Sequence, residues 1–378
     1  MGLVCALGDG CGEAFAALVR GEVPVSPPPF PLPFTTVTGA VRGPLDPLPA
    51  THREYDTRLA RIALRALPQV THAVERLRAR FGAERVAVLL GTSTGGLDAT
   101  EPMYRRYRAH GERTEAFSLR RTHAFDALAN LLRELLALRG PCYAVSTACT
   151  SSAKALASAQ RLIATGIVDA ALVVGADALC ETTVRGFHGI GVLSDRAARP
   201  FSRERDGIHI GEGAAMLVLA RDSEGPVQLA SVGESSDAHA MSAPHPEGTG
   251  AVAAMTDALA RAGLHPSQVD YVNAHGTGTP QNDVAEGRAL LTALGGDVAI
   301  SSSKGATGHT LGACGAIEAV LCAQAIVSGR LPPSTGALPL DALGLNILEK
   351  PVQKRVRVAL SNALAFGGSN ASVVLSAS

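Results

Sequence analysis

A single cysteine stands where a predicted strand passes into a predicted helix. The stretch "CYAVSTAC" ends at Cys149, and the alanine-rich stretch "SSAKALASAQRLIATG" follows it. Free backbone N–H groups and the helix dipole stabilise an anion at such a position. We therefore expect the Cys149 thiol to ionise easily and to attack acyl carbonyls. An inert buried thiol is the alternative, and position alone does not separate the two.

Two histidines follow other predicted strands. His275 lies in "VNAHGTGTPQND" and His309 in "SSSKGATGHTLGACG", each just past an apolar run. Sites in α/β proteins assemble at the carboxyl ends of strands, so we expect Cys149, His275 and His309 to converge. A histidine in a Gly-rich turn is more often a structural hydrogen bonder, but two such turns favour a site. Zinc is the competing interpretation; the long spacings contain no local ligand pair and predict no metal site.

A buried ion pair is predicted beside the second histidine. Glu318 lies in the apolar helix "GAIEAVLCAQAIV", where a charge needs a partner. Lys304 is the natural candidate for this partner. The pair would be structural, or it would position His309; the two roles are compatible.

A glycine pair follows the strand that ends in "SNALAF". Gly367 and Gly368 permit close backbone approach to another group. Phe366 would then act as a movable wall of a site. A simple tight turn before the last strand is the alternative.

Strands and helices alternate along the chain, which predicts an α/β fold with mostly parallel, buried sheets. The apolar spacing between Tyr55 and Phe81 predicts one helix, and the Pro-rich residues 24–34 predict an irregular surface connection. The order of elements restarts near Glu224. We therefore expect two similar halves, residues 1–222 with the cysteine and residues 223–378 with both histidines.

Composition limits the class of protein. Lys and Arg total 34, equal to Asp and Glu, which argues against a nucleic-acid binder. The seven cysteines form no C-x-x-C pair, which is typical of a reducing compartment. No apolar run is long enough to span a membrane, and the start lacks the basic leader of a signal peptide. These features predict a soluble cytoplasmic protein.

Five motifs carry a resemblance. They are "STACTSS", "RPFSRERDGIHIGEGAA", "NAHGTGTPQND", "KGATGHTLGACG" and "FGGSN". In this order they resemble the elongating β-ketoacyl-acyl-carrier-protein synthases, and the match covers essentially the whole chain. The resemblance implies the thiolase fold, two similar α/β halves layered α-β-α-β-α. It also implies a homodimer, or a heterodimer with a related ketosynthase-fold subunit.

The resemblance further implies a reaction without metal or organic cofactor. Cys149 would take an acyl chain from acyl carrier protein, and malonyl-carrier protein would then lose CO2. The resulting enolate would attack the acyl-cysteine and extend the chain by two carbons.

The resemblance assigns roles to individual residues. His275 and His309 would donate N–H bonds to the enolate oxygen, and the backbone N–H groups of Cys149 and Phe366 would hold the oxyanion of acyl transfer. The remaining assignments are Lys304 and Glu318 beside the histidines, Thr277, Thr279 and Ser242 on the pantetheine arm, Phe366 with Gly367 and Gly368 as the gate, and Thr94 and Phe187 in the acyl pocket.

The sequence departs from the family at three places. The first strand is shorter than in the family, Ala240 stands where close relatives often carry histidine, and Ala365 stands where glycine often precedes the gate. Ala365 is expected to stiffen the gate, because alanine does not easily take positive φ. These departures favour a specialised polyene or polyketide pathway over housekeeping fatty-acid synthesis.

Three related classes are alternatives. A thiolase would carry a second catalytic cysteine near the C-terminus, and no cysteine follows Cys322. An initiating synthase would pair the cysteine with His and Asn, whereas the second motif here is "TGH". A chain-length-factor subunit would lack the nucleophile. The last of these is the non-enzyme alternative, and the presence of Cys149 and both histidines opposes it.

Overall fold

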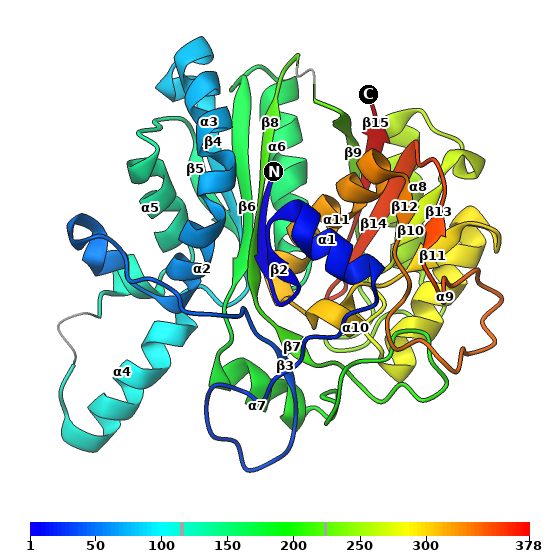
Figure 1. Ribbon diagram of the computed structural model, residues 1–378, viewed down its shortest axis with the longest axis horizontal. Coiled ribbons are helices and arrows are strands. Elements are labelled where there is room, and N and C mark those ends of the chain that lie inside the picture. The colour runs from blue at the N-terminus through cyan, green and yellow to red at the C-terminus, as the bar shows by residue number, and fades with distance from the viewer. Residues whose placement is uncertain (114–116, 223–224) are drawn as a thin grey trace.

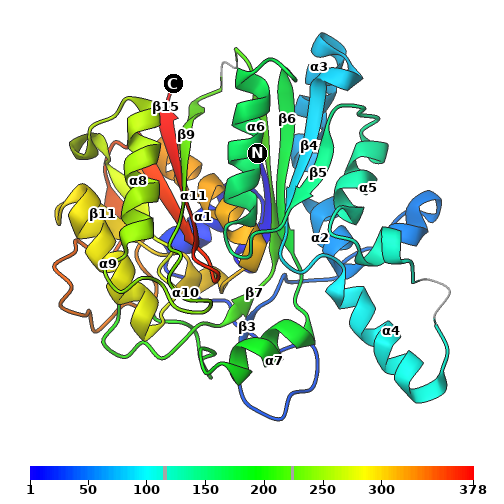
Figure 2. The same cartoon turned by 180° about the vertical axis from the view of Figure 1, so that it is seen from behind.

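Two mixed β-sheets lie side by side with buried helices between them (Figures 1 and 2). The computed structural model describes residues 1–113, 117–222 and 225–378. The first sheet is built from the N-terminal part of the chain. Its strands are, in spatial order, β2 (Gly8–Asp9), β1 (Gly2–Cys5), β8 (Gly213–Ala220), β6 (Ala170–Asp177), β4 (Val86–Gly91) and β5 (Cys142–Val145).

The second sheet comes from the C-terminal part. Its order is β11 (Ala299–Ser301), β10 (Tyr271–Asn273), β14 (Val358–Leu364), β15 (Ser369–Ala377) and β9 (Val227–Ser236). Two further sheets have two short strands each. One pairs β12 (Arg330–Leu331) with β13 (Val352–Gln353), and the other pairs β3 (Thr38–Gly39) with β7 (Ile210–Gly211).

Helices α6 (Ser151–Ala164) and α11 (Cys314–Ser328) contact both sheets and form the middle layer. Helices α2 (Arg58–Ala66), α3 (Pro68–Phe81) and α5 (Ala127–Leu135) cover the outer face of the first sheet. Helices α8 (Thr249–Ala262) and α9 (Pro280–Leu294) cover the outer face of the second (Figure 1). The predicted α-β-α-β-α layering is thus observed. The remaining helices are α1 (Cys11–Val19), α4 (Leu97–His110), α7 (Glu181–Gly189) and α10 (Lys304–Thr307).

Small residues let the middle layer approach the sheets closely. A Cβ on Gly175 of β6 would lie 2.6 Å from the Ala316 Cβ of α11. A Cβ on Gly91 of β4 would lie 2.2 Å from the Ser152 Cα of α6. Contacts this close exclude any side chain, so both helix starts are held against strand ends.

Three sequence expectations need correction. The sheets are mixed and not mostly parallel, because β8 runs antiparallel to β6 and the turn after β14 returns directly as β15. The single helix expected between Tyr55 and Phe81 is two helices, since Pro68 begins α3 and cannot continue α2. One described segment, Leu311–Ser328, is long and apolar enough to span a membrane by length and composition, contrary to the expectation that no run is, but 83% of it is buried inside the protein.

The predicted boundary between the halves, 222/223, falls at residues 223–224, outside the described residues. The sheets change there: β8 is the last strand of the first sheet and β9 opens the second. Because α11 packs on strands of both sheets, the two halves share one core.

Candidate active site

Cys149 lies in the turn between β5 and α6, just before the N-cap residue Thr150. The preceding Ala148 has φ 51°, a left-handed conformation that costs energy for a residue with a side chain. The Thr150 hydroxyl donates to the Thr147 carbonyl at 2.7 Å and stabilises this turn. The turn presents the Cys149 side chain to a cavity, although the residue is only 7% exposed.

The expected easy ionisation of Cys149 is wrong. Burial raises the pKa of this thiol to about 12, although Lys304 and the cysteine's own backbone N–H lower it. The buried Asp177 carboxylate raises it further. Desolvation therefore outweighs the nearby cation and the helix start. The resting nucleophile is a thiol that must lose its proton as it attacks.

His309 contacts the nucleophile directly. Its Nε2 lies 3.0 Å from the Cys149 Sγ, and its Nδ1 accepts a hydrogen bond from the Leu311 backbone N–H at 3.3 Å. An acceptor Nδ1 in a neutral ring assigns the proton to Nε2. His309 therefore presents an N–H group to the sulfur and to the space beside it.

His275 is fixed through its backbone. The N–H groups of His275 and Gly276 both donate to the Glu286 carboxylate of α9, at 2.7 Å each. The His275 ring lies edge-on to the His309 ring, with centroids 5.3 Å apart. Burial, then the Lys304 charge, holds the pKa of each ring well below its usual range. Both imidazoles are therefore neutral at physiological pH.

The three side chains are close enough to hold a metal ion, because their ligand atoms all lie within 4.8 Å of one another. Long sequence spacing was therefore a poor argument against such a site. The hydrogen bonding of His309 is a better argument against a metal site. A metal-binding histidine normally donates its second ring N–H to an acceptor. Nδ1 of His309 instead accepts from Leu311, which leaves a donor at Nε2.

Lys304 and Glu318 form the predicted ion pair between α10 and α11, and both are buried. Burial opposes the Lys304 charge, but Glu318 raises the pKa of this ammonium above its ordinary value. Burial raises the pKa of the Glu318 carboxyl to about 7, against the attraction of Lys304. The lysine charge of this pair lowers the pKa of both imidazoles.

Lys304→Met and Glu318→Gln are each expected to destabilise the protein by roughly 3–5 kcal/mol, because each leaves one charge buried alone. The double variant should lose less than the sum of the two single losses. Urea unfolding of all four proteins measures the coupling. Strictly additive losses would show that the two side chains do not act as a pair.

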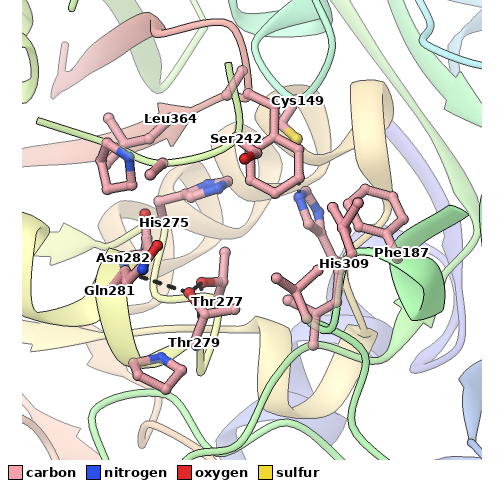
Figure 3. Close-up of a pocket in the computed structure, with 18 of the residues that line it drawn as sticks. Cys149, Phe187, Ser242, His275, Thr277, Thr279, Gln281, Asn282, His309 and Leu364 are labelled. Atoms are coloured by element: carbon pink, nitrogen blue, oxygen red, sulfur yellow. Dashed lines mark hydrogen bonds between the residues drawn. The ribbon is translucent and has the colours of Figure 1, made fainter. Parts of the chain in front are cut away.

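Cys149 lines a cavity of about 440 Å³, and Figure 3 shows the side chains that surround this cavity. Cys149, His275 and His309 lie together in it. Thr277, Thr279 and Ser242 line it as well, and the two threonine hydroxyls lie 2.9 Å apart. Hydroxyl groups in the lining of a cavity can hydrogen-bond an amide-containing arm.

Phe366 follows β14 at the side of the cavity and is 38% exposed. Its ring lies 5.8 Å from that of Phe187, which also lines the cavity. Gly367 and Gly368 have φ of 83° and 76°, so this turn requires glycine at both positions. Ala365 is not among the described residues with positive φ. Among the described residues, the Phe366 backbone N–H has no hydrogen-bond partner and is free to bind an oxyanion.

Thr94 was predicted to lie in the acyl pocket, but the structure places it outside the cavity. It is not among the residues that line the cavity. Its hydroxyl and its backbone N–H both donate to the buried Asp177 carboxylate, at 2.7 and 2.9 Å. The side chain therefore holds the turn after β4 against the end of β6.

Two carboxylates that hold the site loops were not identified from the sequence. Glu286 binds the His275 turn, and Asp283 accepts from the backbone N–H groups of Phe201 and Gly278. Both are fully buried on one face of α9. Two acidic residues three positions apart in a helix that follows a histidine motif were the available signal.

These features define a thiol-dependent acyltransferase: a cysteine in contact with a histidine, two neutral imidazoles and a free backbone N–H around one cavity. Models of the N-terminal and C-terminal β-ketoacyl synthase domains match residues 50–225 and 227–337. The chain belongs to the β-ketoacyl synthase family.

Individual relatives agree with this assignment. The chain is 34% identical over 313 residues to 3-oxoacyl-[acyl-carrier-protein] synthase 2 of Vibrio cholerae, covering 77% of this chain and 76% of the relative. It is 39% identical over 305 residues to nodulation protein E of Rhizobium meliloti, covering 77% and 74%. A solved structure of the ketosynthase ApeO in complex with its chain length factor ApeC, from Xenorhabdus doucetiae, contains a chain that is 39% identical with a TM-score of 0.93. That match covers 100% of this chain and 96% of the other.

Proposed function

We propose that this protein condenses malonyl-acyl-carrier protein with an acyl chain held on Cys149, extending the chain by two carbons. The contact between His309 Nε2 and Cys149 Sγ carries the proposal. In the first step the sulfur attacks the incoming thioester, and the thiol proton leaves with the pantetheine sulfur. The free N–H of Phe366, with that of Cys149, stabilises the tetrahedral oxyanion.

In the second step malonyl thioester loses CO2, and negative charge develops on its carbonyl oxygen. Neutral His275 and His309 are arranged to donate N–H bonds to that oxygen. The enolate carbon then attacks the acyl-cysteine, the bond from carbonyl carbon to sulfur breaks, and the leaving Cys149 thiolate takes up a proton from water. The Lys304 charge helps to keep the rings neutral, and Glu318 holds Lys304 in place. Thr277, Thr279 and Ser242 hold the pantetheine arm, and Phe187 bounds the acyl chain.

The partners in this proposal are acyl carrier protein and a second ketosynthase-fold subunit. The ApeO–ApeC complex supports a partner of the chain-length-factor kind. Strand β5 ends the first sheet with all four residues partly exposed, and an open sheet edge favours pairing with another chain. A second copy of this chain is the other partner that this edge would accept.

The geometry favours the catalytic subunit over a chain-length factor, because nucleophile and donors are in contact. We further propose a specialised polyene or polyketide pathway and a cytoplasmic location. Intact-mass analysis after incubation with carrier proteins bearing different acyl chains tests the function. A stable acyl adduct on Cys149 is expected; the absence of any adduct would contradict the proposal.

Ala365→Gly tests the gate. If Ala365 limits motion of the Phe366 turn, the glycine variant should load long acyl chains faster and short chains at nearly the same rate. Phe366→Ala should blur the order of the two half-reactions, because the cavity would no longer distinguish a free from an acylated cysteine. Loading rates across chain lengths measure both effects. An unchanged profile for Ala365→Gly would show that the gate is not stiffened there.

A further inference from the structure

Helix α7 forms a wall of the acyl cavity; its start is held by Glu101, which accepts from the Glu181 and Thr182 backbone N–H groups, but its end is mostly exposed. Phe187 and Ile190, at the end of this helix, line the cavity, and Ile190 is 52% exposed. Of the nine residues of α7, all of which the structure describes, only Val184 is buried. Few buried contacts identify the parts of a protein that move at low free-energy cost.

Two glycines, Gly186 and Gly189, lie in the last turn of α7, and neither position has a steric need for glycine. Apart from the adjoining residues and the backbone of α7 itself, no described heavy atom lies within 4 Å of the position that a Cβ would occupy on Gly186 or on Gly189. Neither residue has a positive φ, so both positions would accept alanine. Glycine inside a helix costs stability relative to alanine because the unfolded segment loses more freedom on ordering.

The Pro-rich segment supports this wall from outside the cavity. Phe34 stacks on His188 of α7, with ring centroids 3.6 Å apart and planes 5° from parallel. Phe30 and Phe34 pack on the same apolar cluster as Phe187. The two sides of the α7 turn therefore face the cavity through Phe187 and the Pro-rich segment through His188.

We propose that residues 186–190, at the end of α7, form a yielding wall, loosened by Gly186 and Gly189 and supported by Phe34, that sets which acyl chains Cys149 accepts. This inference rests on the proposed acyl loading of Cys149. A short chain fits against the wall as it stands. A long chain requires the turn to move outward, and the glycines lower the cost of that movement.

The test compares loading of Cys149 from butyryl- and palmitoyl-carrier protein by intact mass. Gly186→Ala and Gly189→Ala should slow palmitoyl loading by roughly fivefold, the factor that corresponds to the Gly–Ala difference in a helix. Butyryl loading should change little. Phe34→Ala removes the support and should raise the ratio of palmitoyl to butyryl loading.

Gly12→Ala is the matched control. Gly12 lies in α1, which contributes no residue to the cavity lining, and a Cβ at this position would also have no heavy atom within 4 Å. It should leave the loading ratio unchanged. If the ratio of palmitoyl to butyryl loading were identical in all variants, or changed in Gly12→Ala, the inference about α7 would be overturned and the proposed function would stand. Failure of the unaltered protein to load either chain would overturn the proposed function as well.

Discussion

Cys149→Ala should abolish acyl loading and condensation, the largest single loss expected in this protein. The alanine variant keeps the cavity but has no sulfur to form the thioester, and no other group replaces it at the contact with His309 Nε2. Intact mass after incubation with acyl-carrier protein should show no adduct. An acyl adduct on the alanine variant would show that another residue is the nucleophile.

Cys149→Gln separates the two half-reactions. A neutral amide resembles the acylated cysteine, so this variant should still decarboxylate malonyl-carrier protein while failing to load acyl chains. CO2 release and adduct formation are measured on the same sample. Cys11→Ala is the control, because Cys11 is only partly buried and packs beside the core in α1. That variant should keep both activities.

His275→Ala and His309→Ala should each slow malonyl decarboxylation by about a hundredfold to a thousandfold, the usual loss for one oxyanion donor. Acyl transfer to Cys149 should suffer less, because the Phe366 and Cys149 backbone N–H groups remain. The measurement is CO2 release compared with the rate of adduct formation. A variant that decarboxylates normally would remove its histidine from the mechanism.

The pH profile provides an independent check. Burial and the Lys304 charge hold the pKa of both rings well below the usual histidine range. The rings therefore stay neutral as pH falls through that range, and they take up protons only at lower pH. Decarboxylation by the folded protein should show no loss with the ordinary histidine pKa. A loss centred there that persists in Glu318→Gln would mean that an exposed, ordinary histidine supplies the donor; a loss that this variant abolishes would report protonation of Glu318, whose pKa burial raises to about 7.

Local sequence patterns were enough to predict that Cys149, His275 and His309 converge, and the family motifs supplied their predicted roles. Cys149, His275 and His309 each follow an apolar strand run, and sites in such folds form at strand ends. Glu318 in an apolar helix required a cation, and Lys304 is its partner. These inferences need only the residue types and their order along the chain, together with the high cost of an unpaired buried charge.

The electrostatics of the site, by contrast, depend on how the whole chain packs. The turn before α6 predicted an easily ionised thiol, but burial raises the pKa of Cys149 because desolvation depends on every element packed around it. The proton on His309 Nε2 follows from one contact with the Leu311 N–H. Glu286 holds the His275 turn from a helix, and Thr94 turns to Asp177 instead of the cavity. Contacts such as the last join residues distant in the chain, so no local pattern specifies them.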